Sequence, residues 1–372
     1  MKTGQVHNKY DYWFAGITVL PGRKKICLKN MFEDTKLLYH EKSKTLEHIS
    51  FMTEREREGL AAAQSKSEQE LEQEWEYCIN NQIKLVLWEE EAFPTKLKNI
   101  YNPPYGLFYQ GRFPDHRQTA IGVVGARNCS AYGKAAAMKI GEGLAAAGLA
   151  VISGMAAGVD GAAQKGALNS DGYTCGVLGC GTNICYPASN RELYQQLIKK
   201  GGILSEYPPH TRPLAMNFPQ RNRIISGLSD GVIVVEAKER SGSLITADFA
   251  LEQGRDVYAV PGRICDTFSQ GTNRLISQGA GIFLNMEDFL KEMHIFMKTE
   301  DNSAGKEKIV LENLERLVYS CLDLTPRNLE TLMMETGLTL GVLIENLEVL
   351  RQRGIVSEVY KNYYIRSDTL ES

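Results

Sequence analysis

The sequence of 372 residues lacks a hydrophobic run long enough to cross a membrane as a helix. An uncharged stretch extends from Gly143 to Val159, but it is short for a span and contains four glycines and a serine. The N-terminal segment MKTGQVHNKYDYWF has no apolar signal-peptide core. We therefore expect a protein without a membrane span that resides in the cytoplasm.

Cysteine is also sparse, since eight cysteines in so long a chain are too few for a disulfide scaffold. Cys175, Cys180 and Cys185 are spaced five residues apart, but no histidine or fourth cysteine follows at ligand spacing. We interpret them as small apolar residues around a strand and its loop. The sequence predicts no metal, no cofactor and a reducing environment.

An excess of basic residues is missing as well. The chain has 42 basic and 45 acidic residues, a net charge of −3, and residues 291–372 carry a net charge of −4. A general electrostatic attraction for a polyanion is therefore excluded, and any such ligand must be bound at a local site.

Sequence signatures of common enzymes are absent. There is no HExxH, no GxSxG and no paired Cys/His cluster. Residues 121–134 are not a Walker A motif, because position 128 is Asn and Ala135 follows Lys134, and they lack the GxGxxG fingerprint. Glu206 and Glu236 end strands, where ion pairing with arginines is favoured over acid–base catalysis. We predict a protein that is not an enzyme.

What the chain does contain, from about residue 119 onward, is an alternation of short apolar runs with helical runs. Such strands, separated by helices, predict an α/β fold with a doubly wound parallel sheet covered on both faces, whose ligands bind at the carboxyl ends of the strands. A further short strand is predicted in PPYGLFYQG. The main strands are expected at Ile121–Val124, Leu149–Ser153, Thr174–Leu178, Ile203–Leu204, Val232–Val235 and Val257–Val260.

The flanking regions have a different composition. Residues 1–80 are predicted to be helical, and the polar stretch 298–306 is predicted to be a linker. Residues 307–372 combine three amphipathic helical runs with the hairpin-like pair IVSEVY and YYIR, the pattern of a small winged-helix domain.

Four glycine-rich junctions in the central region carry the candidate site. They are IGVVGARNCSAYGK, SGMAAGVDGAA, GVLGCGTNICYPASN and the long segment from Phe218 to Gly262. A strand that ends at a glycine before a helix points backbone N–H groups at an anion, and arginine binds phosphate through its planar fork. The candidate ligand-binding residues are Gly125, Arg127, Ser130, Gly154, Gly158, Phe218, Arg221, Asn222, Arg223, Ser241, Gly242 and Ser243.

Each feature also has a purely structural explanation. A glycine-rich turn is common in α/β sheets, Asp160 could be a helix cap as readily as a ligand contact, and Ser241 and Ser243 are good caps. Arg127 alone could form a surface ion pair. The coincidence of several such junctions with arginines in one domain favours a phosphate-binding site.

These motifs, together with LSEYPP and GTNRLISQGA, occur in the order seen in the DNA-processing protein A family (DprA, or Smf), which the chain resembles over roughly residues 100–290. Arg127 matches the arginine of the family's Gly-Ser-Arg motif, Arg221 and Asn222 match its FPxRNR motif, and Ser241–Ser243 match its SGS turn. The chain differs in having Ala126 before Arg127 and no lysine in YPASN or PLAMNF.

The resemblance implies a Rossmann-like domain that binds single-stranded DNA, loads the RecA recombinase during DNA processing and natural transformation, and forms a homodimer. Phe218 and Tyr186 could stack on bases or belong to the core. The expected domains are a helical N-terminal domain (1–80), a Rossmann-like DNA-binding domain (81–297, core 119–290), a linker (298–306) and a winged-helix domain (307–372).

Two alternatives remain open. A nucleotide-processing enzyme of Rossmann-like fold would also place a glycine-rich turn before a helix, although a Pro-Gly-Gly-x-Gly-Thr motif is expected there and this chain has KERSGSL. A winged-helix transcription regulator is disfavoured by Glu345 and Glu348 in the presumed recognition helix, because carboxylates repel phosphates. Those acidic residues favour a protein-contact role for the C-terminal domain.

Overall fold

The structure is a computed structural model that describes residues 7–41, 45–46, 49–295 and 313–366. The predicted linker, 298–306, lies outside the described residues. The chain forms two compact units: residues 1–128 with 137–288, and residues 129–136 with 289–372. Within the described ranges, no helix is long and apolar enough to cross a membrane.

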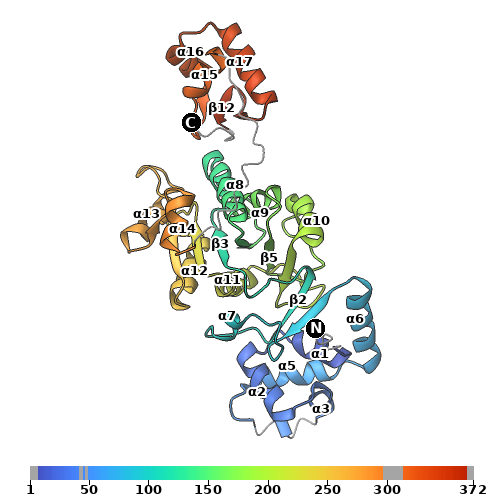
Figure 1. Cartoon of the computed structure of the whole chain (residues 1–372). Coiled ribbons are helices and arrows are strands. Elements are labelled where there is room, and N and C mark those ends of the chain that lie inside the picture. The colour runs from blue at the N-terminus through green and yellow to red at the C-terminus, as the bar shows by residue number, and fades with distance from the viewer. Residues whose placement is uncertain (1–6, 42–44, 47–48, 296–312, 367–372) are drawn as a thin grey trace. The chain divides into compact units, whose positions relative to one another are not determined.

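The first unit is built around a large central sheet (Figure 1). Its described strands are β1 (Lys84–Leu87), β2 (Gly106–Gly111), β3 (Ala120–Val124), β4 (Ala150–Ser153), β5 (Thr174–Leu178), β6 (Gly202–Ser205), β7 (Gly231–Val234), β8 (Asp256–Ala259) and β9 (Gly281–Ile282). All six predicted main strands are present, and the strand predicted in PPYGLFYQG is β2.

The strand order is β1-β2-β6-β5-β4-β3-β7-β8-β9. From β6 to β9 neighbouring strands are parallel, whereas β1 pairs antiparallel with β2 and β2 pairs antiparallel with β6. The sheet is therefore mostly parallel rather than purely parallel as predicted. The difference arises because β1 and β2 add a hairpin to the β6 edge.

Helices cover both faces of the sheet. Consecutive residues of β5 point to opposite faces of the sheet and enter different hydrophobic cores. Leu178 packs with Leu193 and Leu197, and Val177 packs with Ile224 and Ile225. In Figure 1 the first face is covered by α9 (Val159–Asn169) and α10 (Arg191–Lys200), and the second by α11 (Asn217–Leu228) and α12 (Gly242–Glu252). The remaining helices of this region are α7 (Thr95–Lys98), α8 (Ala131–Ala146), the 3-10 turn Ala188–Asn190, α13 (Gln270–Ser277) and α14 (Met286–Glu292); α8 and α14 contain residues of both units.

The connection order creates a topological switch point. The chain passes from β3 through β4 and β5 to β6 on one side and then returns to β7 on the other side of β3. Helices leaving β3 and β7 lie on opposite faces, so a crevice opens at the carboxyl ends of these two strands. Any ligand of this sheet is expected there.

The helices before β1 share a core with the β1–β2 hairpin. Phe14, Leu28 and Leu60 are buried together with Tyr105 and Phe108. The helices that begin at Glu54 and Glu68 each start with a capping box, and the second box is formed by Ser67 and Glu70. The described helices are α1 (Lys9–Ala15), α2 (Gly22–Phe32), α3 (Thr35–His40), α5 (Glu54–Gln64) and α6 (Glu68–Asn80).

His7 makes the stability of this region depend on pH. Its side chain is 9% exposed, and Nε2 lies 3.0 Å from a carboxylate oxygen of Glu90. Burial lowers the pKa of His7, but hydrogen bonds to Asp11 and Glu90 outweigh burial and raise it to about 9 from 6.5. The folded state therefore holds the proton more tightly than the unfolded chain. This stabilisation is fully present below pH 6.5 and is lost as the pH rises through about 9.

We expect the His7→Leu substitution to reduce the free energy of unfolding by about 3 kcal/mol at pH 6 and by much less at pH 9.5, because each pKa unit is worth about 1.4 kcal/mol. Urea denaturation of both proteins at the two pH values measures the difference. An equal loss at both pH values would contradict a role for the His7 charge.

The second unit contains three helices and a small sheet within residues 313–366. The helices are α15 (Asn313–Ser320), α16 (Leu329–Thr336) and α17 (Leu340–Gln352); the strands are β10 (Arg327–Asn328), β11 (Val356–Tyr360) and β12 (Tyr363–Arg366), in the order β10-β12-β11. Val318, Leu332 and Leu347 belong to one core. Strand β10 was not predicted, and residues 307–312, at the start of the predicted winged-helix domain, lie outside the described part of the chain.

Candidate functional site

A cavity of about 420 Å³ lies at the switch point between β3 and β7. It begins at Val124, the last residue of β3, and extends to the first turn of α12. Eight of the twelve predicted site residues line it, from two of the four glycine-rich junctions: Gly125, Arg127, Phe218, Arg221, Asn222, Ser241, Gly242 and Ser243.

Arg127 is the exposed cation of this cavity. Its guanidinium carbon lies 4.9 Å from the centre of the Phe218 ring, a cation–π arrangement. The Phe218 ring in turn lies 5.5 Å from the ring of Tyr186, which is 40% exposed. No ion pair of Arg127 is found among the described side chains. The guanidinium is therefore available to an anion beside an aromatic surface.

Backbone hydrogen bonds hold the loop that carries Arg127. The N–H of Ala126 donates to the carbonyl of Glu236, at the end of β7, over 2.8 Å, and the N–H of Val159 donates to the carbonyl of Ala126 over 3.3 Å. These bonds connect the loop to the strand beside it and to the start of α9. Arg127 thus projects from a restrained backbone.

Gly158 explains how α9 can approach this loop so closely. Its φ is +77°, and an added Cβ would lie 2.3 Å from the carbonyl oxygen of Ala126 and 2.5 Å from that of Arg127. Only glycine fits such a contact without displacing backbone. Gly158 therefore supports the loop from behind and does not line the cavity.

Arg221 and Asp160 are buried close to each other at the base of the cavity, beside Gly154. Arg221 is 4% exposed and donates from Nη1 to the carbonyl oxygen of Gly154 (2.7 Å) and to that of Val177; Asp160 is 6% exposed and accepts from the N–H of Gly154 (3.0 Å). Burial raises the pKa of Asp160 against the effect of Arg221, and burial lowers the pKa of Arg221 to about 10. Arg221 remains a cation at neutral pH.

Gly154 permits this pair to approach the backbone. An added Cβ would lie 2.5 Å from Nη1 of Arg221 and 2.6 Å from Oδ2 of Asp160. The predicted residue Gly154 therefore acts below the cavity rather than on its surface.

The N-terminus of α12 faces the cavity from the opposite side. Ser241 caps the helix by accepting from the N–H of Ser243, and the two hydroxyl oxygens are 2.7 Å apart. Asn222 Nδ2 donates to the carbonyl of Gly242 over 3.3 Å, which joins α11 to this turn. An added Cβ on Gly242 would meet nothing within 4 Å, so the backbone at this turn is open to a ligand. Free N–H groups at a helix start favour an anion.

The last two predicted residues are not among those that line the cavity. Arg223 has a side chain that is 6% exposed and donates from Nη2 to Oε2 of Glu206 over 2.5 Å, outside the cavity. Glu206 is thus an ion-pair partner, as the sequence favoured. Ser130 belongs to the second unit, where its Oγ accepts from the N–H of Gly133, so its position relative to the cavity is not defined.

Several lining residues were not among the predicted site residues. Pro213 and Ala215, from the segment after β6, and Ile245 and Thr246, from α12, complete the walls. Their residue types carry no chemical signature, so only their place in the fold identifies them. The sequence left Asp160 open between a helix cap and a ligand contact; in the structure it is buried at the base of the cavity, accepts from the N–H of Gly154 and interacts electrostatically with Arg221.

The doubly wound sheet, with an arginine and a helix start at its switch point, defines an α/β protein of the class that binds ligands at the carboxyl edge of its strands. Residues 84–294 match the model of the family described as DNA recombination-mediator protein A. The chain belongs to this family.

Individual relatives agree with this assignment. The DNA processing protein DprA of Bacillus subtilis is 45% identical over 212 residues, which are 57% of this chain and 71% of the relative. The X-ray structure of DprA from Streptococcus pneumoniae is similar with a TM-score of 0.67 at 33% identity, covering 77% of this chain and 99% of that one. A DNA processing protein A from Helicobacter pylori, described for its single-stranded DNA binding mode, has a TM-score of 0.52 at 29% identity, covering 57% and 96%.

Proposed function

We propose that this protein binds single-stranded DNA at the switch-point cavity. The observation that carries the proposal is the exposed guanidinium of Arg127, which lies against Phe218 and opens to the same cavity as the start of α12. Single-strand binding needs cations and N–H groups for phosphates and aromatic faces for bases. The binding mode described for the Helicobacter pylori relative supports the same ligand class.

The bases would stack on Tyr186, whose exposed ring continues the surface of Phe218. Lys238 and Arg240 are exposed in the loop before α12, on either side of the exposed Glu239, and are further cations close to this helix start. Few phosphate contacts are expected for one subunit, because the net charge of the chain is −3.

Fluorescence anisotropy with a labelled oligo-dT tests the proposal. We expect binding that weakens with rising salt, with a slope in log–log form of about −0.7 for each phosphate contact. Binding that is insensitive to salt would contradict a phosphate-binding cavity.

We propose that the protein acts without turnover. Asp160 is the one carboxyl group among the described residues that line the cavity, and its oxygens accept hydrogen bonds from backbone N–H groups. Incubation with nucleoside monophosphates, followed by chromatography, distinguishes this proposal from a nucleotide-processing enzyme. Released base would favour the enzyme.

We further propose that the bound strand is a substrate for RecA loading in DNA processing and natural transformation, in the cytoplasm. A loading assay on single-stranded DNA coated with its binding protein tests this role, and faster RecA filament formation with the chain present is expected. Oligonucleotide binding without any effect on loading would reject the loading role while leaving the DNA site intact.

The domain division that we propose is a helical N-terminal domain (1–80), a DNA-binding domain (81–297, core 119–290), a linker (298–306) and a winged-helix domain (307–372). The three helices and the small sheet within 313–366 support the last of these. Glu345 is exposed on α17, and Glu348 pairs with Arg351 over 2.9 Å. These carboxylates support contact with protein rather than with duplex DNA.

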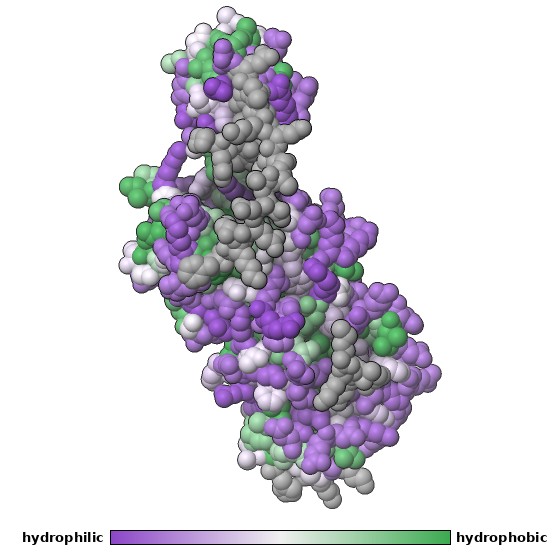
Figure 2. Space-filling view, in the orientation of Figure 1, coloured by the Kyte–Doolittle hydropathy of each residue, from purple (hydrophilic) through white to green (hydrophobic). Residues whose placement is uncertain are grey.

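We propose a homodimer that uses the β9 edge of the sheet. Ile282 and Leu284 are 46% and 69% exposed, whereas Phe283 between them is 8% exposed, so the exposed pair shares one side of the chain. Figure 2 shows hydrophobic residues, in green, gathered on the part of the first unit that contains α13. An exposed apolar edge strand is a surface for self-association.

Arginine at both Ile282 and Leu284 is expected to convert a dimer of about twice 41.5 kDa into a monomer, because burying two charges in an apolar interface is unfavourable. Light scattering after gel filtration measures the mass. The control is Leu37→Arg, which alters an exposed apolar residue of α3 (59% exposed). A dimer that persists in the double variant places the interface elsewhere.

A further inference from the structure

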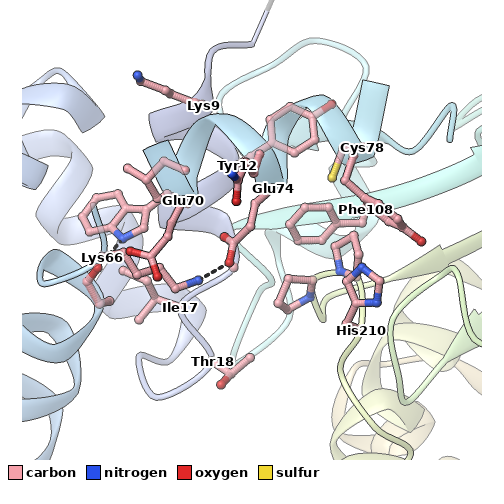
Figure 3. A pocket seen from close by; sticks show the side chains of 18 of the residues that line it. Lys9, Tyr12, Ile17, Thr18, Lys66, Glu70, Glu74, Cys78, Phe108 and His210 are labelled. Carbon is pink, nitrogen blue, oxygen red and sulfur yellow. Dashed lines mark hydrogen bonds and ion pairs between the residues drawn. The ribbon is translucent and has the colours of Figure 1, made fainter. Parts of the chain in front are cut away.

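A larger cavity, of about 650 Å³, lies in the first unit away from the switch point (Figure 3). It is bounded by α1, α5, α6, β2 and the segment after β6. Its floor is apolar, because Tyr12, Trp13, Ile17, Leu71 and Phe108 line it and are buried. This volume is within the range of about 300–1,000 Å³ that is typical of ligand pockets.

The rim of this cavity is negatively charged. Of the glutamates on α6, Glu70 and Glu74 line the cavity, and Glu68 and Glu72 lie beside it against Lys9. The two lysines at the rim are already neutralised: Lys66 lies 2.5 Å from Glu74, and Lys9 lies 2.6 Å from Glu68 and 3.0 Å from Glu72. Carboxylates are therefore in excess around an apolar floor. A phosphate backbone would be repelled by this rim, and a cationic group would be attracted.

The wall of the cavity that contains His210 is held in place by contacts with α6. In Figure 3, Ile17, Glu70 and Glu74 lie on one side of the opening and Phe108 and His210 on the other. The ring of His210 lies 4.4 Å from that of Tyr77, and Asn183 Nδ2 donates to Tyr77 Oη over 3.0 Å. Both walls are therefore connected by direct contacts, and the cavity is formed before any ligand arrives.

We propose that this cavity docks a basic segment of a partner protein, which inserts one aromatic or branched apolar side chain onto the floor and places lysine or arginine against the glutamates of α6. Charge complementarity selects this occupant, since the floor fits an apolar side chain and the excess carboxylates fit cations. The site is separate from the proposed DNA-binding cavity and does not depend on DNA binding.

The test uses the full chain and a fluorescein-labelled peptide of sequence KKWKKLKK. Two matched peptides replace either every lysine with glutamate or the tryptophan and leucine with glycine. We expect saturable anisotropy with the first peptide and at least about tenfold weaker binding of the other two. Equal binding of the glycine peptide, or no saturation up to about 1 mM, would overturn the proposal.

Substitutions in the chain locate the site. Thr18→Trp fills the opening from an exposed position, and Glu70→Gln with Glu74→Gln removes two rim charges, while a glutamine side chain can still complete the capping box with Ser67. Each is expected to weaken peptide binding by at least about tenfold. Ile79→Trp and Glu76→Gln, on α6 but outside the cavity lining, are the controls and should bind normally.

Two further measurements distinguish the proposed peptide-binding cavity from the proposed DNA-binding cavity. All four variants should bind oligo-dT with unchanged affinity. A benzophenone group in place of the peptide tryptophan should crosslink to residues 12–19, 63–78 or 208–210. Crosslinks confined to other segments, or peptide affinity unchanged in Thr18→Trp, would place the peptide elsewhere.

Discussion

Replacing Arg127 with alanine is expected to weaken oligo-dT binding by about tenfold to a hundredfold, because a charge-assisted hydrogen bond to phosphate is worth about 1.5–3 kcal/mol. The side chain is exposed, and no acidic partner competes for it among the described residues. The salt slope should also become shallower by about 0.7, the value of one single-strand phosphate contact. Anisotropy titrations at several salt concentrations measure both quantities.

Two variants serve as controls for this result. Arg117→Ala removes an arginine whose side chain is 79% exposed and paired with Asp115, so DNA binding should be unchanged. Arg127→Lys keeps the charge but loses the two-pronged donor, and intermediate affinity is expected. An Arg127→Ala protein that binds as tightly as the unmodified chain, with the same slope, would remove the main support for the proposed site.

Replacing Arg221 with methionine is expected to destabilise the protein by about 3–5 kcal/mol, because the buried carboxyl group of Asp160 loses the electrostatic attraction of a buried cation. The carbonyl oxygens of Gly154 and Val177 would also lose their donor. Urea denaturation followed by circular dichroism measures the loss. Loss of DNA binding in this variant would report unfolding of the cavity floor rather than a lost phosphate contact.

Adding Asp160→Asn to Arg221→Met separates the effect of the buried charge of Asp160 from the effect of the altered side-chain packing at position 221. The double variant should recover at least about 1 kcal/mol relative to Arg221→Met, since neighbouring sites in one network are not additive. Burial raises the pKa of Asp160, so the loss in the single variant should shrink as the pH falls and the carboxyl group takes up a proton. A single variant that loses less than about 0.5 kcal/mol would show that the pair is not structural.

The strands and helices of the central region could be predicted because each is marked locally. A run such as Ile121–Val124 is apolar on both faces and ends at a glycine, and the structure places β3 there. The short strand β1 was not predicted. Its pairing with β2 depends on contacts with the N-terminal helices, which are distant in sequence.

The three arginines of the predicted site show where prediction from sequence ends. Arg127, Arg221 and Arg223 have the same chemistry, and their motifs suggested the same role. The structure exposes Arg127 and buries the other two, one against carbonyls of Gly154 and Val177 and the other against Glu206. These partners come from other strands, so no local pattern could assign them.

The local amino-acid sequence determined which segments form helices and strands, where the glycine-rich junctions lie and which family the chain resembles, because glycine, helix-capping and apolar patterns act over a few residues. Tertiary structure decided which junctions share a cavity, which arginine is exposed, and where a second, acidic-rimmed cavity forms. The physical reason is that burial and hydrogen bonding depend on contacts between segments as far apart as Gly154 and Arg221, and only the folded sheet brings such segments together.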